Sequence, residues 1–549
     1  MSVFLGIATV LALVALAGRL AGRQHRLLHL FQLEHYEGAR LMLWLRRRSE
    51  LFQVGELAAV TVLLLAGVLA NAWVSGWLCG ALLLLVTPLA ALGVADWRRE
   101  AVKPLVLTGR AKRLLAVALM PPVLLALAGV VVAAAGLTTA ALAVLMFTGV
   151  VLLAGSPWTL VMANTLLKPV QSSINRRYVE RARGSLREWN PLVVGITGSY
   201  GKTTTKFCVG AVLEADRPTL VTPESFNSFL GVIRTINEHL QSRHRAFVVE
   251  MGMFRRGDIT ELCELVHPTV GVITAIGPMH LERLGSIEAI TAAKGELLDA
   301  LPPDGHFVTN AEDPRCVELA ERAHVPVTLF GIDSESAQVL ARDVRLVDGR
   351  TVFQLHLDGP ESTPIAVSAG LLGRHNVSNL LAAAAVGQVL GVSPQRIVEG
   401  LQRVQAPAHR LQPIHNRRAS IVVIDDAYNS NPEGAAAALE VLREHPASRR
   451  LLVTPGMVEL GEMEVELNRR FGEQAGMVCD VAILVGHTRT IPIREGLSAA
   501  GVDPANVHVV GDIAQATTLL GRLTRAGDVV LFENDLPDTY AEVGVPVGA

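Results

Sequence analysis

The chain has 549 residues, of which 50% are hydrophobic and 18% are charged, and its formal net charge at pH 7 is −2. This length suggests about three domains, and the near-neutral charge gives no argument for a nucleic-acid partner. The five cysteines form no Cys-x-x-Cys pair and are odd in number. The sequence therefore indicates neither a disulfide framework nor a zinc site, and it fits a reducing cytosol.

Long apolar stretches without charge mark the first third of the chain. Residues 57–95 and 114–167 contain no charged side chain, and each stretch can supply two membrane passes at about 20 residues per helix. Together with the apolar residues 2–18, they predict a membrane domain over residues 1–165, with buried helices of a soluble protein as the alternative. The five expected helices lie near residues 2–18, 55–73, 76–95, 114–135 and 138–162.

Basic residues indicate the orientation of this domain. They follow the first, third and fifth apolar segments, whereas the loops near residues 74–77 and 134–139 carry none. The positive-inside rule predicts a multi-pass plasma-membrane protein with its N-terminus outside and the catalytic domains in the cytoplasm, after a basic linker over residues 166–190. The first segment lacks a basic start, so we expect a retained anchor instead of a cleaved signal peptide. Residues 25–45 fit either a helix lying on the inner membrane surface or a plain linker helix.

A glycine-rich loop follows the apolar run 192–194, with the sequence Gly-Ile-Thr-Gly-Ser-Tyr-Gly-Lys-Thr-Thr-Thr over residues 195–205. Glycines allow backbone N–H groups to close around phosphate oxygens, Lys202 adds charge, and Thr203 can ligate Mg²⁺. A helix is expected over residues 207–213. The strict phosphate-loop pattern would require a glycine at Ile196, so a glycine-rich turn with an incidental lysine is the alternative.

Beyond residue 190, apolar strands alternate with helical segments, which predicts two parallel α/β sheets. We expect a phosphate-loop central domain over residues 191–408 and a Rossmann-like C-terminal domain over residues 409–549. A strand-rich insertion over residues 339–367 interrupts the alternation. The expected strands are residues 192–197, 246–250, 270–275, 305–310, 420–425, 450–453, 481–485 and 529–532.

Polar side chains stand where several of these strands end. Glu250, Asp425 and Asp426 close strands, and His280 and Lys294 follow another. Taken singly, each also fits an ordinary place in a fold: a solvated strand end, a loop or helix cap, an exposed helix position or a turn. Because ligands bind outside the carboxyl ends of parallel strands, the set as a whole indicates one site.

Seven segments in chain order resemble the Mur ligase family, and within it the branch that adds D-alanyl-D-alanine to a muramoyl peptide. They are Thr-Gly-Ser-Tyr-Gly-Lys-Thr-Thr (197–204), Glu-Met-Gly (250–252), Gly-Pro-Met-His-Leu-Glu (277–282), Gly-Ser-Ile-Glu (285–288), Ala-Lys-Gly-Glu (293–296), Gly-Arg-His-Asn-Val-Ser-Asn (373–379) and Asp-Asp-Ala-Tyr-Asn-Ser-Asn-Pro (425–432). The resemblance implies an ATP-dependent amide ligase that turns an acceptor carboxylate into an acyl phosphate, which an incoming amino acid or dipeptide amine then attacks.

The resemblance also implies roles for individual residues. Lys202 would stabilise the transferring phosphoryl group, Thr203 and Glu250 would hold one Mg²⁺, and His280 with a carbamylated Lys294 would hold a second. The further positions expected to contact ATP are Gly198, Ser199, Gly201, Thr204, Asn310, His375, Asn376, Arg410, Asp425 and Asp426. The positions expected on the substrate side are Asn227, Tyr428, Asn429 and Asn431.

The chain departs from the family pattern before its phosphate loop. Only about thirty residues separate the last apolar segment from Gly195, too few for a domain that binds a uridine-nucleotide sugar. In addition, His409-Arg410 stands where a Gly-Arg pair is more common. We therefore expect a membrane-anchored ligase whose acceptor is soluble or lipid-linked at the bilayer. A membrane-tethered polyglutamate-type ligase and an ATP-driven transporter or regulatory module are the alternatives.

Overall fold

The structure is a computed structural model that divides the chain into two compact units, one mainly within residues 1–176 and one mainly within residues 177–536. In the first unit, the described residues form helices and turns, whereas the second unit is α/β. The described residues are 2–34, 36–47, 58, 60–62, 66, 76–85, 87–98, 105–135, 139–224, 226–279, 284–347, 349–416, 419–428, 430–458 and 460–535.

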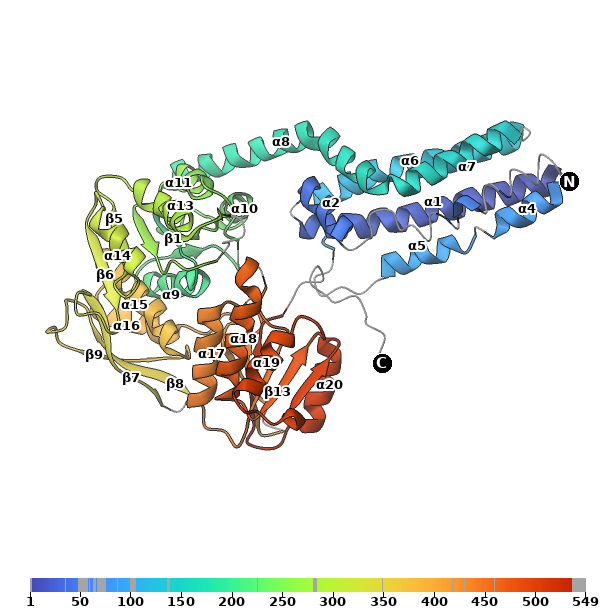
Figure 1. The fold of residues 1–549 in the computed structure, drawn as a ribbon. Coiled ribbons are helices and arrows are strands. Elements are labelled where there is room, and N and C mark those ends of the chain that lie inside the picture. Colours follow the sequence, from blue (N-terminus) through green and yellow to red (C-terminus); the bar gives the residue numbers. More distant parts are fainter. Residues whose placement is uncertain are drawn as a thin grey trace. The chain divides into compact units, whose positions relative to one another are not determined.

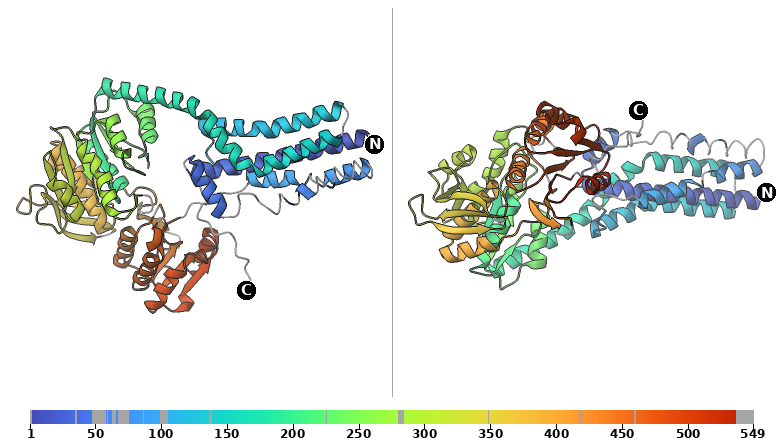
Figure 2. Two further views of the ribbon diagram at one scale, coloured as in Figure 1. Left: turned by 45° about the horizontal axis from the view of Figure 1, so that its top comes forward. Right: turned by 90° about the horizontal axis from the view of Figure 1, so that it is seen from below.

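The helices of the N-terminal unit run side by side (Figures 1 and 2). Helix α1 (Ser2–Leu33) contacts α4 (Gly76–Leu84), α5 (Leu89–Arg98), α6 (Gly109–Ala135) and α7 (Thr139–Ala154). Its residues Leu13, Leu16 and Leu20 are spaced by three or four positions, so they share one face. That face packs against Leu125 of α6 in a buried apolar cluster.

Two expected membrane helices are interrupted in the structure. Residues 76–95 form α4 and α5, with Pro88 just before α5, and residues 138–162 form α7 and the start of α8 (Ser156–Trp189), with a bend of 72° at Gly155. At both places the structure therefore has two helices where one was expected. Pro88 and Pro157 stand at the beginning of the second helix of each pair, where proline costs no helical hydrogen bond.

Only part of the expected membrane domain meets the length and composition of a membrane span. Among the described helices, Gly109–Val132 does so, and a second span results if the bent pair Phe147–Ala154 and Ser156–Trp189 counts as one. The span expected near residues 55–73 falls mostly outside the described residues. Residues 25–45 belong to two helices, α1 and α2 (Gly38–Arg47), and the expected linker at 166–190 is helical up to Trp189.

The central part of the second unit is built on a nine-stranded sheet with the order β2-β3-β1-β4-β5-β6-β7-β8-β9. Neighbours from β2 to β7 are parallel, and β8 and β9 add antiparallel strands. The expected strand-rich insertion forms β7 to β9, which extend this sheet. The strands are β1 (Leu192–Thr197), β2 (Thr219–Val221), β3 (Ala246–Glu250), β4 (Val270–Ile273), β5 (His306–Asn310), β6 (Val327–Gly331), β7 (Val339–Val347), β8 (Arg350–His356) and β9 (Ile365–Ala369).

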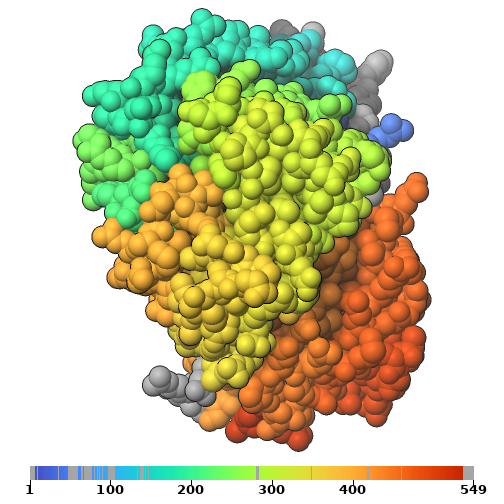
Figure 3. All heavy atoms as spheres, turned by 90° about the vertical axis from the view of Figure 1, so that its left-hand side faces the viewer, coloured from blue at the N-terminus to red at the C-terminus, as the bar shows by residue number. Residues whose placement is uncertain are grey.

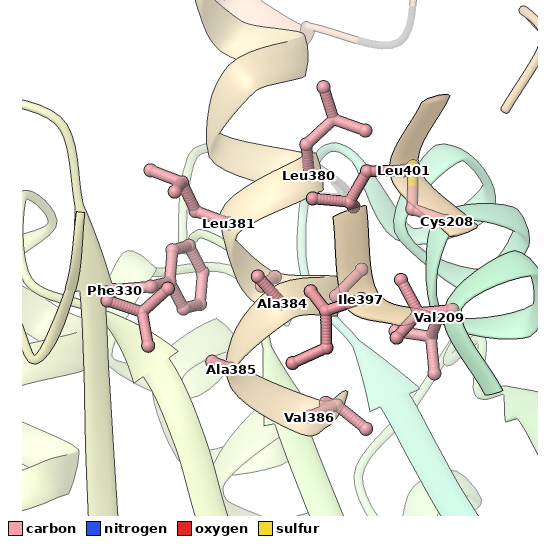
Figure 4. Close-up of a cluster of buried hydrophobic side chains, with 14 of the residues drawn as sticks. Cys208, Val209, Phe330, Leu380, Leu381, Ala384, Ala385, Val386, Ile397 and Leu401 are labelled. Carbon is pink, nitrogen blue, oxygen red and sulfur yellow. The ribbon is translucent and has the colours of Figure 1, made fainter. Parts of the chain in front are cut away.

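Side chains of the central strands point alternately to the two faces of the sheet, and an apolar core lies on each face. In β3, Val248 joins the core beneath α9 (Lys202–Glu214), α15 (Arg374–Val389) and α16 (Pro394–Arg403), while Phe247 and Val249 join the core on the opposite face. This alternation follows from the two-residue period of a strand. Figure 4 shows the first core, where Cys208 of α9, Leu380 of α15 and Ile397 of α16 come together. In the space-filling view, the yellow β7–β9 segment adjoins the orange α15 and α16 (Figure 3).

The opposite face of this sheet carries α10 (Phe229–His239), α11 (Asp258–Val266), α13 (Ile287–Asp299) and α14 (Pro314–Glu321). Val179, Ala182 and Leu186, from the last turns of α8, pack into the same core. The end of α8 is thus part of the α/β unit.

The last part of the second unit has a six-stranded sheet with the order β10-β11-β15-β12-β13-β14, parallel except for β10. Helices α17 (Pro432–Glu444), α18 (Glu464–Gly476) and α19 (Ile491–Ala499) cover one face, and α20 (Ile513–Leu523) covers the other. The strands are β10 (Gln412–Asn416), β11 (Ile421–Asp426), β12 (Arg450–Thr454), β13 (Val481–Val485), β14 (Val507–Val510) and β15 (Val529–Glu533). The prediction of two parallel-rich α/β sheets is confirmed.

Candidate active site

The glycine-rich loop leads from β1 directly into the first turn of α9, which begins at Lys202, earlier than expected. Gly201 precedes this helix with φ +76°, a left-handed conformation that favours glycine. A Cβ atom there would lie 2.4 Å from Asn379 Oδ1, and one on Gly198 would lie 2.0 Å from Thr274 Oγ1. The loop therefore favours glycine at both positions, and the free N–H groups at the N-terminus of α9 are donors of the kind that bind an anion.

Lys202 folds its side chain back over this loop. Its Nζ donates to the carbonyl oxygens of Gly198 at 2.7 Å and Ser199 at 3.3 Å. Burial lowers the pKa of Lys202, while the nearby Glu250 carboxylate opposes that shift. A cation is thus held where phosphate oxygens would enter.

The carboxylate of Glu250, at the end of β3, accepts hydrogen bonds from three side chains, two on the first turns of α9 and one in a loop. Its Oε1 accepts from Thr203 Oγ1 at 3.2 Å and from Asn227 Nδ2 at 2.9 Å, and its Oε2 accepts from Lys206 Nζ at 3.0 Å. Burial by itself would raise the pKa of Glu250, but Lys206, Lys202 and the Asn227 hydrogen bond outweigh it and lower the pKa. Glu250 is therefore an anion at neutral pH although its side chain is only 2% exposed.

Lys294, on α13, is buried in the wall of the same pocket. Burial, and then repulsion by Lys202, lower its pKa well below the usual value for lysine. Within the described part of the chain, no hydrogen bond or ion pair engages its amine. Burial thus disfavours the charged form of this amine.

The C-terminal sheet contributes a cation and a pair of carboxyl groups. The guanidinium of Arg410 lies 4.3 Å from the centre of the Tyr428 ring. Asp426 Oδ1 accepts from the Leu411 N–H at 3.0 Å, and Asp426 pairs in register with the buried Glu533 across β11 and β15. Burial raises the pKa of Asp426 to about 6 and that of Glu533 well above its usual value. The pair therefore holds a proton near neutral pH.

Except for Lys206 and Glu533, these groups line one pocket of about 270 Å³. Most of the expected site residues meet in its wall: Ser199, Gly201, Lys202, Thr203, Thr204, Asn227, Glu250, Lys294, His375, Asn376, Arg410, Asp426, Tyr428 and Asn431. Three others are not part of the wall. The carbonyl oxygen of Gly198, within the loop, accepts from Lys202 Nζ, Asn310 accepts from the Glu312 N–H, and Asp425 lies 2.8 Å from His409 Nδ1. His280 and Asn429 are outside the described residues.

Several residues in or beside the pocket were missed by sequence reasoning. Lys206 contacts Glu250 from α9, and its spacing of four residues from Lys202 places both lysines on one face of that helix. That spacing was a usable signal. Asn379 accepts from Thr205 Oγ1 at 3.0 Å and donates to Asn376 Oδ1 at 2.9 Å, and these contacts depend on how α15 packs. The lining also includes Tyr200, Met251, Gly252, Met253, Phe254, Met279, Leu411 and Gly434.

His409 has φ +60°. Glycine is the residue that tolerates this conformation best, which explains why a Gly-Arg pair suits the position in the family pattern. In this chain the side chain of His409 contacts the Asp425 carboxylate, a contact that glycine could not make.

Two family models match this part of the chain. The Mur ligase middle domain matches residues 196–387, and the Mur ligase glutamate ligase domain matches residues 409–533. Among similar curated proteins, the UDP-N-acetylmuramoyl-tripeptide–D-alanyl-D-alanine ligase of Mycobacterium leprae is 33% identical over 366 residues, which cover 62% of this chain and 70% of that protein. The enzyme of the same name from Synechocystis is 32% identical over 358 residues, covering 65% and 74%.

Solved structures agree with these matches. MurF from Acinetobacter baumannii aligns with a TM-score of 0.59 and 28% identity over 66% of this chain and 78% of that chain. MurF from Thermotoga maritima in complex with ADP aligns with a TM-score of 0.58 and 25% identity over 66% and 80%. The chain belongs to the Mur ligase family of ATP- and Mg²⁺-dependent ligases, which join a carboxylic acid to an amino acid.

Proposed function

We propose that this protein adds D-alanyl-D-alanine to a muramoyl tripeptide acceptor. The observation that carries the proposal is the single pocket in which the phosphate loop, Glu250 and Lys294 meet, in a chain similar to ligases with that name. An acceptor carboxylate oxygen would attack the γ-phosphorus of ATP and release ADP. The dipeptide amine would then attack the acyl carbon, lose a proton and expel phosphate.

The chain's own groups support the first step. We assign Lys202, which already lies inside the loop, to the transferring phosphoryl group, where its charge offsets the negative charge that accumulates. The N-terminus of α9, with Ser199, Gly201 and Thr204, would hold the remaining phosphate oxygens. Gly198 belongs to this assignment as the residue that gives the loop its path.

The donors beside the loop fit one Mg²⁺. Protein-bound Mg²⁺ takes one or two carboxylates together with substrate phosphates and water, and Thr203 Oγ1 lies 3.2 Å from Glu250 Oε1. No three His, Cys, Asp or Glu side chains gather around a metal position among the described residues, a set that does not include His280. An ion held by Thr203 and Glu250 would neutralise charge on the phosphates.

The burial of Lys294 supports its assignment as a carbamylated lysine. Carbon dioxide reacts with a neutral amine, and the product is a carbamate anion and a proton. The resulting oxygen donors, with His280, would provide the second Mg²⁺ site.

The remaining assignments divide between nucleotide and substrate. We assign the nucleotide side to Asn310, His375, Asn376, Arg410, Asp425 and Asp426, of which Asn310 and Asp425 stand outside the described pocket wall. We assign the substrate side to Asn227, Tyr428, Asn429 and Asn431. Closure of the C-terminal domain (residues 409–549) over the central domain (residues 191–408) would exclude water from the acyl phosphate.

We further propose that residues 1–165 form a multi-pass anchor in the plasma membrane, with the ligase domains in the cytoplasm. Large apolar side chains on α6 and α7 support this, because Leu127 is 57% exposed, Val131 is 65% exposed and Phe147 is 70% exposed. Exposed apolar surface of this kind marks a membrane or protein interface. The acceptor would then be a soluble nucleotide-linked or a lipid-linked muramoyl peptide at the bilayer.

The test is ligation by the detergent-purified full-length protein, followed by mass spectrometry. D-alanyl-D-alanine and ATP are offered with soluble uridine-linked muramoyl tripeptide and, separately, with an extracted lipid-linked precursor pool. A mass gain of one dipeptide on either acceptor that disappears in Lys202→Met supports the proposal and names the acceptor. Absence of a gain on both acceptors, from protein that still binds ADP, would refute it.

A further inference from the structure

A second cavity, of about 410 Å³, lies within the N-terminal unit. Its walls come from the turn between α1 and α2, the first turns of α6 and the middle of α8. Three of its lining residues are cations, namely Arg110, Arg113 and Lys168. No carboxylate is found among the described residues that line it. We call this cavity the basic pocket.

The two arginines are held in place by neutral groups. Arg110 donates to Asn164 Oδ1 at 3.0 Å, and Arg113 donates to Gln171 Oε1 at 2.7 Å. Within the described chain, neither arginine nor Lys168 has an ion-pair partner. Each guanidinium carries five N–H donors, so most of them remain available, and no described carboxylate balances the positive charge of the pocket.

Tyr36 completes the wall in a strained conformation. Its φ is +62°, which is unusual for a bulky residue and costs about 1–3 kcal/mol. Three contacts maintain it: its N–H donates to Phe31 O at 2.7 Å, its carbonyl accepts from Asn164, and its hydroxyl accepts from Gln32. The strained turn places the ring 4.0 Å from the Arg110 guanidinium carbon, which fixes the plane of that side chain.

We propose that the basic pocket binds a phosphate or diphosphate group, carried by a membrane lipid or by a soluble nucleotide. Arginine forks match phosphate oxygens in geometry as well as charge, and two of them face one cavity here. A di- or trianion would supply the charge that the lining lacks. Arg110 and Arg113 stand at the beginning of the apolar segment Gly109–Val132, the level at which lipid phosphates meet a membrane helix. This site is independent of the ligation chemistry.

The test measures binding to the full-length protein in detergent. The probes are short-chain phosphatidic acid, with short-chain diacylglycerol as the phosphate-free lipid, and UDP as a soluble diphosphate. All variants carry Lys202→Met, which weakens the phosphate loop as a competing site. Arg110→Gln and Arg113→Gln are compared with Lys112→Gln, since Lys112 lies between them on α6, is exposed and does not line the pocket.

We expect one of the phosphate probes to bind, with affinity about tenfold weaker in either arginine variant and weaker still in the double variant, as for loss of charge-assisted hydrogen bonds. Lys112→Gln should bind like the parent. Binding of phosphatidic acid identifies a lipid source, and binding of UDP identifies a soluble one. If neither probe binds, or if Lys112→Gln weakens binding as much as the arginine variants do, the proposal is overturned. Equal midpoints of thermal unfolding show that the variants are folded.

Discussion

The ammonium group of Lys206 lies 3.0 Å from Glu250 Oε2, and both side chains are almost wholly buried, at 0% and 2% exposure. Lys206 also donates to the carbonyl oxygen of Glu224. The lysine therefore stabilises the ionised form of a carboxylate that also faces Thr203 at the phosphate loop. A cation outside the expected site thus maintains the charge of a proposed Mg²⁺ ligand.

Replacing this cation should destabilise the fold. Lys206→Met leaves the Glu250 carboxylate buried without its cation, and we expect a loss of about 3–5 kcal/mol in the free energy of unfolding. The measurement is urea denaturation. The double variant Lys206→Met with Glu250→Gln should recover much of that stability but no ligation, because the carboxylate is gone. An additive loss in the double variant would contradict the coupling.

The φ of +76° at Gly201 should make this residue irreplaceable for nucleotide binding. Gly201→Ala adds both backbone strain and a clash with Asn379, so we expect ADP affinity to fall at least about tenfold. Gly257→Ala is the matched control, because Gly257 has φ +90° with no atom within 4 Å of an added Cβ. It should cost about 1 kcal/mol of stability from strain alone and leave ADP affinity unchanged. Equal ADP affinities in the two variants would disprove the steric argument.

Carbamylation of Lys294 predicts a dependence on carbon dioxide. Ligation measured in buffer stripped of carbon dioxide should fall, and bicarbonate should restore it. Lys294→Arg should abolish ligation although it keeps a cation, because a guanidinium forms no carbamate. Lys206→Arg is the control for replacing a buried lysine by arginine. Because Lys294 is intact in this variant, its remaining ligation should still depend on bicarbonate. Full ligation by Lys294→Arg would exclude the carbamate.

The carboxyl pair Asp426 and Glu533 predicts a pH-dependent stability. Because burial raises both pKa values, to about 6 for Asp426, the stability contributed by the protonated pair is fully present below pH ~4 and is lost as pH rises through about 6. Glu533→Gln keeps an acceptor for Ser430 Oγ, which donates to Glu533 at 2.6 Å. This variant should unfold at a higher temperature than the parent at pH ~8 and show little difference at pH ~4.

Thermal unfolding across that pH range measures the effect. Glu440→Gln, on the exposed side of α17, should give no pH-dependent difference from the parent. A parallel shift of Glu533→Gln at all pH values would mean that the pair holds no proton in the folded state.

The last turns of α8 determine where a truncated chain that retains the core of the α/β unit can begin. A chain that starts at Arg177 keeps Val179 and Ala182 in the core, whereas one that starts at Ser185 loses both. We expect the shorter chain to be less stable by about 1–3 kcal/mol, as measured by urea denaturation. If the N-terminal unit contributes to acceptor binding, the chain from Arg177 should bind ADP normally and ligate soluble acceptor more slowly than the full-length protein. Ligation at the full rate would mean that the N-terminal unit does not contribute to binding of the soluble acceptor.

The local pattern of residues along the chain was enough to predict several strands and the phosphate loop. The apolar runs predicted β1, β3 and β13 with the bounds that the structure gives, because strand formation depends on side chains a few residues apart. The glycine spacing predicted the phosphate loop, and Lys202, Thr203, Glu250 and Lys294 do meet in one pocket. Strand β2 was not expected, because three residues carry little pattern.

Only the tertiary structure decided which distant residues become neighbours. Glu250 meets Thr203 and Lys206 because β1 pairs with β3, and Asp426 meets Glu533 because β11 pairs with β15. The β7–β9 insertion extends the central sheet for the same kind of reason, since β7 pairs with β6. The alternation of side chains shows that a segment is a strand, but it does not show which strand lies beside it. That choice depends on how all the helices and strands pack, so the buried Lys206–Glu250 pair and the basic pocket could not be derived from the sequence.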